Sequence, residues 1–243
     1  MSFTSPRILW LIPARSGSKS IPDKNIRDLK GLPLLAYRIK SALSISDKEN
    51  VWCSTDSRMY ADIAASVGAS VPFIRPGKLS GDLSSSNDVV QHAMDHAEKQ
   101  GKTYDIIGLL EPTSPFIYAD DLISAVSRLW ESSDADSIVA VRESRPNSIF
   151  VQEESEYLDL LAKNLKKIEL QGRQSQKKEI TPSGGFYISK WNAFKRNHSF
   201  YTEKTLAFRV APESELEIDE ETDWLWAEFL LEKKIIDVGR LYK

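Results

Sequence analysis

The sequence predicts an α/β fold in which a mostly parallel sheet is covered by helices. Short apolar runs rich in β-forming residues alternate with longer stretches that place apolar residues at helical spacing, which is the pattern of successive β-α units. The chain has 243 residues, of which 41% are hydrophobic, and this is enough for the core of one large domain. We therefore expect residues 1–243 to form a single domain.

The first part of the chain carries the most regular alternation. Residues 8–12 (ILWLI) form the first predicted strand, and a helix is expected to open at Pro33, whose fixed φ suits a first helical turn. Residues 51–55 (VWCST) are the next strand. The helix after it should begin near Asp56 and end at Gly68, because glycine readily adopts the left-handed conformation that follows many helices.

The alternation continues to about residue 141. Residues 71–76 (VPFIRP) are typical of a short edge strand, because prolines cannot donate to an interior ladder. Residues 87–99 predict a helix and residues 105–110 (DIIGLL) a buried strand. A further helix at 120–130 precedes a strand at 137–141 (SIVAV). The order of elements is that of a parallel sheet.

A charged and irregular segment interrupts this pattern from about 142 to 183. The pattern resumes with a predicted strand at 185–189 (GFYIS), another at 206–210 (LAFRV) and a helix over 223–233. We interpret the segment as an excursion from the main sheet, and a dimerisation arm, a lid and a plain surface insertion are the alternatives.

The composition argues against several classes of protein. Lys and Arg number 32 against 35 Asp and Glu, giving a formal net charge of -3, which is unlike a general binder of nucleic acid or membrane surfaces. A single cysteine, Cys53, allows no internal disulfide and suits a reducing compartment. The N-terminal apolar run is far shorter than the roughly 20 residues of a membrane span. We expect a cytoplasmic protein without nucleic-acid or membrane partners.

Positive charge is concentrated directly after the first predicted strand. The loop PARSGSKSIPDKN places Arg15, Lys19 and Lys24 among small residues. Open α/β sheets bind ligands at the carboxyl ends of their strands, and cations combined with backbone amides suit a polyphosphate. The spacing matches neither a Walker A loop nor GxGxxG. A solvated, lysine-rich turn is the alternative reading of the loop alone.

This loop is one of several segments that occur together. The others are STDS at 54–57, VPFIRP at 71–76, LLEPTSPF at 109–116 and LEIDEETDW at 216–224. In this order and at this spacing the set resembles the N-acylneuraminate cytidylyltransferase family, the synthetases of CMP-activated sialic acids and related nonulosonic acids. The resemblance covers about residues 7–232. It implies a three-layer, Rossmann-like nucleotidyltransferase (GT-A-like) fold with a small dimerisation arm at about 142–183.

The resemblance also implies a reaction and its partners. Such an enzyme transfers CMP from CTP to the anomeric hydroxyl of a nonulosonic, sialic-acid-like sugar and releases pyrophosphate. Cations on the loop would neutralise the charge that builds on the leaving group, and a hard divalent cation prefers oxygen ligands. The implied cofactor is Mg²⁺, and the implied assembly is a homodimer.

The roles of individual residues follow motif by motif from the resemblance, with Arg15, Lys19 and Asp219 as catalytic residues. The nucleotide would be held by Ala14, Arg15, Ser18, Lys19, Lys24, Asn25 and Arg75. The sugar would be held by Glu111, Thr113, Ser114, Arg173 and Gln174, the last two being alternatively part of the arm. Glu217 and Asp219 would hold the metal, because residues two apart on an extended segment point to the same side. A helix N-terminus is the alternative reading of this acidic cluster.

Two residues depart from the family pattern. Glu111 stands where the family has glutamine in LQPTSP, and an ionised carboxylate only accepts hydrogen bonds. Its charge would repel the carboxylate of an ulosonic acid. Either the sugar differs from ordinary sialic acid, or Glu111 is protonated or faces another partner such as an amino substituent. Glu217 replaces the first aspartate of the DID motif and would bind a metal from a shifted backbone.

Two other functions stay open at the level of sequence. Asp134 and Asp136 imitate the DxD metal motif of glycosyltransferases that use nucleotide sugars, although their place just before a predicted strand favours a turn. A non-catalytic relative that only binds a nucleotide or a partner is the second alternative, since the altered acidic residues could abolish turnover.

Overall fold

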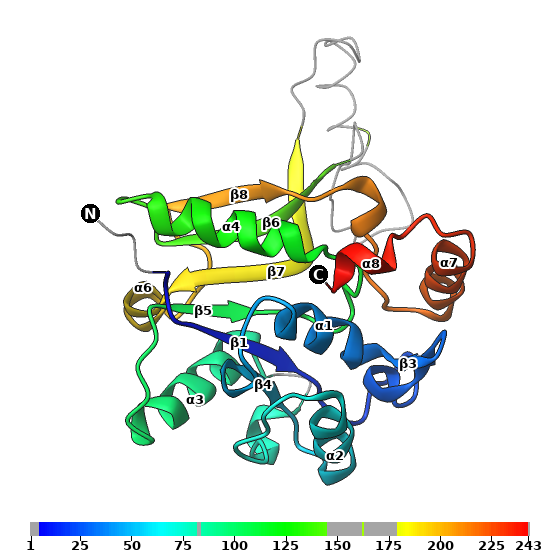
Figure 1. The fold of residues 1–243 in the computed structure, drawn as a ribbon, viewed down its shortest axis with the longest axis horizontal. Coiled ribbons are helices and arrows are strands. Elements are labelled where there is room, and N and C mark those ends of the chain that lie inside the picture. Colours follow the sequence, from blue (N-terminus) through cyan, green and yellow to red (C-terminus); the bar gives the residue numbers. More distant parts are fainter. Residues whose placement is uncertain (1–4, 82–83, 145–161, 163–178, 243) are drawn as a thin grey trace.

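A six-stranded sheet runs through the middle of the molecule, in the strand order β4-β1-β5-β7-β6-β8 (Figure 1). The computed structural model describes residues 5–81, 84–144, 162 and 179–242. The strands are β1 (Ile8–Pro13), β4 (Val51–Ser54), β5 (Ile106–Leu109), β6 (Ser137–Glu143), β7 (Ile180–Lys190) and β8 (Thr205–Arg209). Only β7 runs antiparallel to its neighbours in this sheet, so the sheet is mostly parallel, as predicted.

Helices cover both faces of this sheet. They are α1 (Leu34–Leu43), α2 (Arg58–Val67), α3 (Ser86–Lys99), α4 (Ala119–Glu131) and α6 (Trp191–Asn197), whereas α7 (Glu221–Glu232) and α8 (Val238–Leu241) belong to a third apolar cluster. One buried apolar cluster joins α1, α2 and α4 to one face of the sheet, and another joins α3 and α6 to the opposite face. The result is the three-layer arrangement that the sequence predicted.

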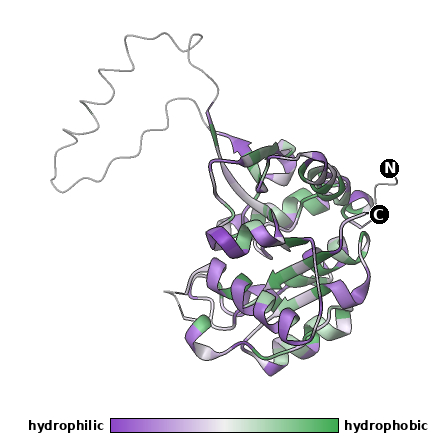
Figure 2. Ribbon diagram, turned by 90° about the vertical axis from the view of Figure 1, so that its left-hand side faces the viewer, coloured by the Kyte–Doolittle hydropathy of each residue, from purple (hydrophilic) through white to green (hydrophobic). Residues whose placement is uncertain are grey.

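Strand β1 shows why both faces are covered. Trp10 and Ile12 belong to the first apolar cluster, whereas Leu9 and Leu11 belong to the second, and all four side chains are buried. Successive side chains of a strand point to opposite faces, so a continuously apolar strand needs a cover on each side. Figure 2 shows hydrophobic colour along the central strands and a mixture of hydrophobic and hydrophilic colour on the surrounding helices.

The expected edge strand at 71–76 is wrong. This segment contains no strand in the structure, and Pro72 and Pro76 remove two of the donors that a ladder needs. The backbone N–H of Arg75 instead donates to the carbonyl of Thr55 at 2.8 Å. The segment is thereby attached to the carboxyl end of β4, which brings the Arg75 side chain to that edge of the sheet.

The other expected elements are present with shifted ends. Helix α1 begins one residue after Pro33, because Pro33 pairs with Asp28 in a small hairpin of β2 (Asp28–Leu29) and β3 (Leu32–Pro33). The short helices α6 and α8 were not predicted. Strand β7 begins five residues before the expected 185.

Most of the segment interpreted as an arm, residues 145–161 and 163–178, lies outside the described residues. Its described ends are strand residues: Arg142 pairs with Thr181 and Glu143 with Ile180. The segment therefore leaves from the central sheet and returns to it. Among the helices that the structure describes, none has the length and apolar composition needed to cross a membrane.

Candidate active site

The loop after β1 forms one wall of a cavity of about 420 Å³, called here the first cavity. Gly17 adopts a φ of 74°, a left-handed conformation that glycine accepts without strain. The backbone N–H and the hydroxyl of Ser16 each donate to Asp56 at 2.9 Å. The amide of Asn25 donates to the carbonyl of Arg15 at 3.0 Å. These contacts hold the loop in a defined shape before any ligand binds.

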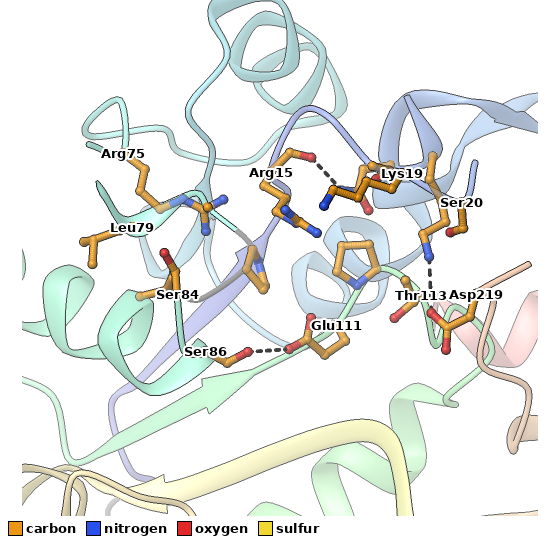
Figure 3. A pocket seen from close by; sticks show the side chains of 17 residues that line it. Arg15, Lys19, Ser20, Arg75, Leu79, Ser84, Ser86, Glu111, Thr113 and Asp219 are labelled. Atoms are coloured by element: carbon orange, nitrogen blue, oxygen red, sulfur yellow. Dashed lines mark hydrogen bonds and ion pairs between the residues drawn. The ribbon is translucent and has the colours of Figure 1, made fainter. Parts of the chain in front are cut away.

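Four basic side chains line the first cavity: Arg15, Lys19, Lys24 and Arg75. Figure 3 shows Arg15 and Arg75 on one side of it and Glu111 below them. Arg75 is nearly buried and its Nε donates to the hydroxyl of Ser80 at 3.1 Å, while burial lowers its pKa. Several basic groups converging on one hollow, with hydroxyl groups between them, suit a polyanion.

The opposite wall is tied to the segment before α7. The backbone N–H of Ile218 donates to the carbonyl of Thr113 at 2.8 Å, and the Ile218 side chain is buried. Its neighbours Glu217 and Asp219 lie on the other side of this extended segment, where Asp219 is exposed and Glu217 is half-buried. Lys24 Nζ reaches across to Asp219 Oδ1 at 3.3 Å and to the Ile218 carbonyl at 2.8 Å. Basic and acidic groups meet at this point.

The helix-terminus interpretation of the acidic cluster is correct for Glu220 and Asp223. Glu220 is the N-cap of α7, and the Glu220 and Asp223 side chains form a capping box. Glu217 and Asp219 lie outside this box. Burial, followed by the charge of Asp219, raises the pKa of Glu217.

Glu217 and Asp219 fit a hard divalent cation. Their oxygens are the donors that Mg²⁺ prefers, and a cation would relieve the repulsion that raises the pKa of Glu217. Within the described residues there is no group of three or more His, Cys, Asp and Glu side chains able to hold a metal.

Glu111, at the end of β5, lines the first cavity and also a second cavity of about 230 Å³. Its Oε1 accepts from the Ser86 hydroxyl at 3.5 Å. Burial, and then the charge of Glu217, raise the pKa of Glu111 to about 7, while the Ser86 hydrogen bond and the charges of Arg75 and Arg38 act in the opposite direction. The carboxyl is thus held at the junction between two hollows.

The second cavity has an aromatic wall that the sequence analysis missed. Tyr187 of β7 lies 5.7 Å from Phe200 and 6.2 Å from Tyr201 between ring centroids. We call these three residues the aromatic cluster. The adjacent Phe200 and Tyr201 in a short loop between a helix and a strand were the available signal, because loop aromatics are often solvent-facing.

The structure brings together most of the residues assigned to the nucleotide. Six of the seven line the first cavity: Arg15, Ser18, Lys19, Lys24, Asn25 and Arg75. Ala14 is different, because its side chain is buried and its backbone N–H donates to the Ser54 carbonyl at 2.9 Å. Ala14 therefore supports the loop from beneath.

The residues assigned to the sugar and the metal are more dispersed. Glu111, Thr113 and Asp219 line the first cavity. The Ser114 hydroxyl is buried against Gly184, where an added Cβ would lie 2.9 Å from Ser114 Oγ and 2.8 Å from Glu217 Oε1. Glu217 thus packs beside β7 at the back of this wall. Arg173 and Gln174 lie outside the described residues.

The DxD-like pair lies at the opposite edge of the sheet. Asp136 immediately precedes β6, which runs parallel to β1, so the pair is at the amino ends of the strands and the cavities are at the carboxyl ends. Asp136 is paired with Arg196 at 2.9 Å and Asp134 with Lys204 at 3.2 Å. These carboxylates do not face the first cavity, which removes the basis of the glycosyltransferase reading.

Fold and site together define an α/β protein of the nucleotidyltransferase type. A solved CMP:2-keto-3-deoxy-manno-octonic acid synthetase complexed with CTP has a TM-score of 0.66 to this chain, with 15% identity over 94% of this chain and 99% of that one. A 4-diphosphocytidyl-2C-methyl-D-erythritol synthase from Anaerococcus prevotii has a TM-score of 0.55, with 13% identity over 93% and 96%. At such identities the likeness is one of fold.

The chain belongs to the cytidylyltransferase family, whose model matches residues 9–237. It is 32% identical to an N-acylneuraminate cytidylyltransferase from Escherichia coli O18:K1:H7, over 94% of this chain and 53% of that protein. It is 33% identical to a CMP-N,N'-diacetyllegionaminic acid synthase from Legionella pneumophila, over 93% and 97%. A pseudaminic acid cytidylyltransferase from Campylobacter jejuni is 39% identical over 124 residues, which are 51% of this chain and 53% of that protein.

These likenesses confirm the resemblance that the sequence motifs predicted. The chain spans about half the length of several curated relatives that it matches, including the Escherichia coli protein, and nearly all of the Legionella one.

Proposed function

We propose that this protein transfers CMP from CTP to the anomeric hydroxyl of a nonulosonic, sialic-acid-like sugar and releases pyrophosphate. The observation that carries the proposal is the first cavity, in which four basic side chains converge opposite carboxylates at the carboxyl ends of β1 and β5. Relatives named as cytidylyltransferases of sialic, legionaminic and pseudaminic acids support the class of substrate.

In this proposal the protein acts mainly by positioning the two reactants and by stabilising the charge of the leaving pyrophosphate. Arg15 and Lys19 neutralise the leaving pyrophosphate as the bond from the α-phosphorus to the bridging oxygen breaks. The sugar occupies the second cavity, and its anomeric hydroxyl meets the α-phosphorus in the first cavity. Holding both reactants in one geometry removes most of the entropic cost of their encounter.

Glu217 and Asp219 would hold the divalent cation. When bound, Mg²⁺ supplies charge stabilisation to the phosphate oxygens without needing a proton. Lys24 links Asp219 to the phosphate side of the cavity, because its Nζ lies 3.3 Å from Asp219 Oδ1.

The test is pyrophosphate release from CTP and Mg²⁺ across a panel of nonulosonic acids, with UTP and ATP as controls. We expect CTP-dependent release with at least one acid. Release with none of them, by folded protein that still binds CTP, would instead favour a nucleotide-binding module without catalysis. The homodimer and the cytoplasmic location also stay predictions; sedimentation and cell fractionation would test them.

A further inference from the structure

The two cavities differ in the sign of their charge. The first cavity is lined by four basic side chains and by two acidic ones, Glu111 and Asp219, so basic groups predominate there. Of the described residues that line the second cavity, Glu111 is the only charged one, and its companions include Ser86, Asn87 and Leu109. The charge of Glu217 acts on Glu111 as well. A ligand that spans both hollows therefore meets a positive potential at one end and a negative one at the other.

The aromatic cluster strengthens this contrast. Its three rings border the second cavity together with Glu111. The face of an aromatic ring carries negative charge density, and a cation within about 6 Å of the ring centre is attracted to it. The Tyr187 ring has both other rings of the cluster as neighbours, at 5.7 and 6.2 Å. A carboxylate beside several aromatic rings is the chemistry that recognises an ammonium group.

This distribution of charge orients the sugar. A nonulosonic acid carries its carboxylate on the anomeric carbon, and Glu111 would repel that carboxylate from the second cavity. The acid end is drawn to the basic first cavity, where the anomeric hydroxyl must react. The part of the sugar remote from the anomeric carbon then occupies the second cavity, against Glu111 and the aromatic cluster.

The choice of group at that remote end follows from the chemistry of a carboxylate. An ionised Glu111 only accepts hydrogen bonds, whereas an acetamide offers both a donor and an acceptor. A protonated amine only donates, and it adds positive charge beside a carboxyl group whose pKa is raised by burial. Burial and Glu217 raise the pKa of Glu111 to about 7, and a bound ammonium acts in the opposite direction.

We infer that this protein uses a nonulosonic acid with a free, protonated amine on the part of the sugar remote from the anomeric carbon, bound by Glu111 and the aromatic cluster. The inference rests on the proposed function and deepens it. It assigns Glu111 as the residue that selects an amine over an acylated nitrogen.

Two matched pairs of nonulosonic acids test the inference. The two members of each pair differ in one nitrogen group, which is a free amine in one member and an acetamide in the other. In the first pair this group is on the ring carbon across from the anomeric centre, and in the second it is on the terminal carbon of the side chain. With CTP and Mg²⁺, we expect kcat/KM to favour the amine in at least one pair by about 10- to 100-fold, as for a hydrogen bond to a charged group.

Variants locate the origin of the preference. Glu111→Gln should reduce the amine preference to below about threefold, because the charge and the acceptor-only character are both lost. Tyr187→Phe should retain the preference and Tyr187→Leu should weaken it, because only the former keeps the ring face. The matched control is Glu98→Gln, which removes a carboxylate that lies 2.8 Å from Lys195 on the α3 and α6 side of the sheet. It should leave the preference unchanged.

The outcomes separate the inference from the proposed function. CTP-dependent turnover of the acetamides with no amine preference in either pair would overturn the inference and leave the proposed function standing. An amine preference that survives in Glu111→Gln would also overturn it, because another group would then select the amine. Pyrophosphate release with none of the acids counts against the proposed function itself, and the inference fails with it.

Discussion

The first and second cavities share Glu111, yet the chain builds them in different ways. Much of the first cavity comes from one continuous loop after β1, with Arg15, Lys19 and Lys24 close together in the sequence. The second cavity is assembled from the start of α3, β5 and the residues just after it, β7 and the loop that follows α6. Binding a polyanion needs several charges near one another, which a short loop can supply. Selecting one sugar needs a shape, and that requires walls from distant parts of the chain.

The largest expected effect comes from removing charge from the first cavity. Arg15→Ala should lower kcat/KM for CTP by about 100- to 1000-fold, as the loss of one group that stabilises developing charge commonly does. Pyrophosphate release at varied CTP measures it. The control is Arg128→Ala. Arg128 lies on α4, away from the cavities, and its guanidinium donates to the carbonyl of Ala207 at 2.9 Å. A loss below about threefold in Arg15→Ala would mean that the loop does not contribute to the reaction.

A smaller effect is expected at the acidic wall. Asp219→Asn should raise the Mg²⁺ concentration needed for half-maximal activity by about 10- to 100-fold, because one anionic ligand is lost. Chelation with EDTA should abolish activity, and added Mg²⁺ should restore it. Glu220→Gln is the matched control, because Glu220 caps α7. An equal shift in both variants would mean that helix capping, and not metal binding, explains the result.

The free energy of unfolding should depend on pH through Glu111, which lies at the junction between the cavities. The pKa of Glu111 is raised from the ordinary value near 4.5 to about 7 in the folded protein. Between these values the folded state binds the extra proton, so the free energy of unfolding falls as pH rises through this window. In urea titrations without ligand or Mg²⁺, the wild type should lose on the order of 2 kcal/mol more than Glu111→Gln between pH 4.5 and 8. Parallel pH profiles for the two proteins would contradict the raised pKa.

The smallest effect is expected at the rim of the second cavity. Tyr201→Phe keeps the ring of a half-exposed residue and removes only its hydroxyl. Because the proposed contact is with the ring face, kcat/KM for the preferred acid should change by less than about threefold. Steady-state kinetics on the amine pair measure this. A loss of tenfold or more would mean that the Tyr201 hydroxyl, and not its ring, makes the contact with the acid.

Local patterns were sufficient to predict much of the fold. Strand β1 is apolar on both faces, which predicts a strand covered on both sides, and Gly68 ends α2 with a φ of 116° as its position predicted. The strand predicted at 71–76 is wrong. Its β-forming residues favour a strand, but Pro72 and Pro76 lack the backbone N–H groups that pairing in a sheet requires. Propensity is a preference of single residues, whereas a strand needs a partner that the backbone can reach.

The sequence also predicted the ligand-binding loop of the first cavity, because this loop is contiguous and combines basic with small residues. It did not predict the aromatic cluster. Tyr187 reaches the second cavity only because β7 pairs antiparallel with β5, placing Tyr187 opposite Leu109. That pairing joins residues almost eighty positions apart, and no local spacing encodes it. The sequence alone therefore determined the strands of the central sheet, the basic loop and the family, since these depend on neighbours along the chain. Tertiary structure alone decided that Glu111 stands between a basic hollow and an aromatic one, since that depends on which strands lie side by side.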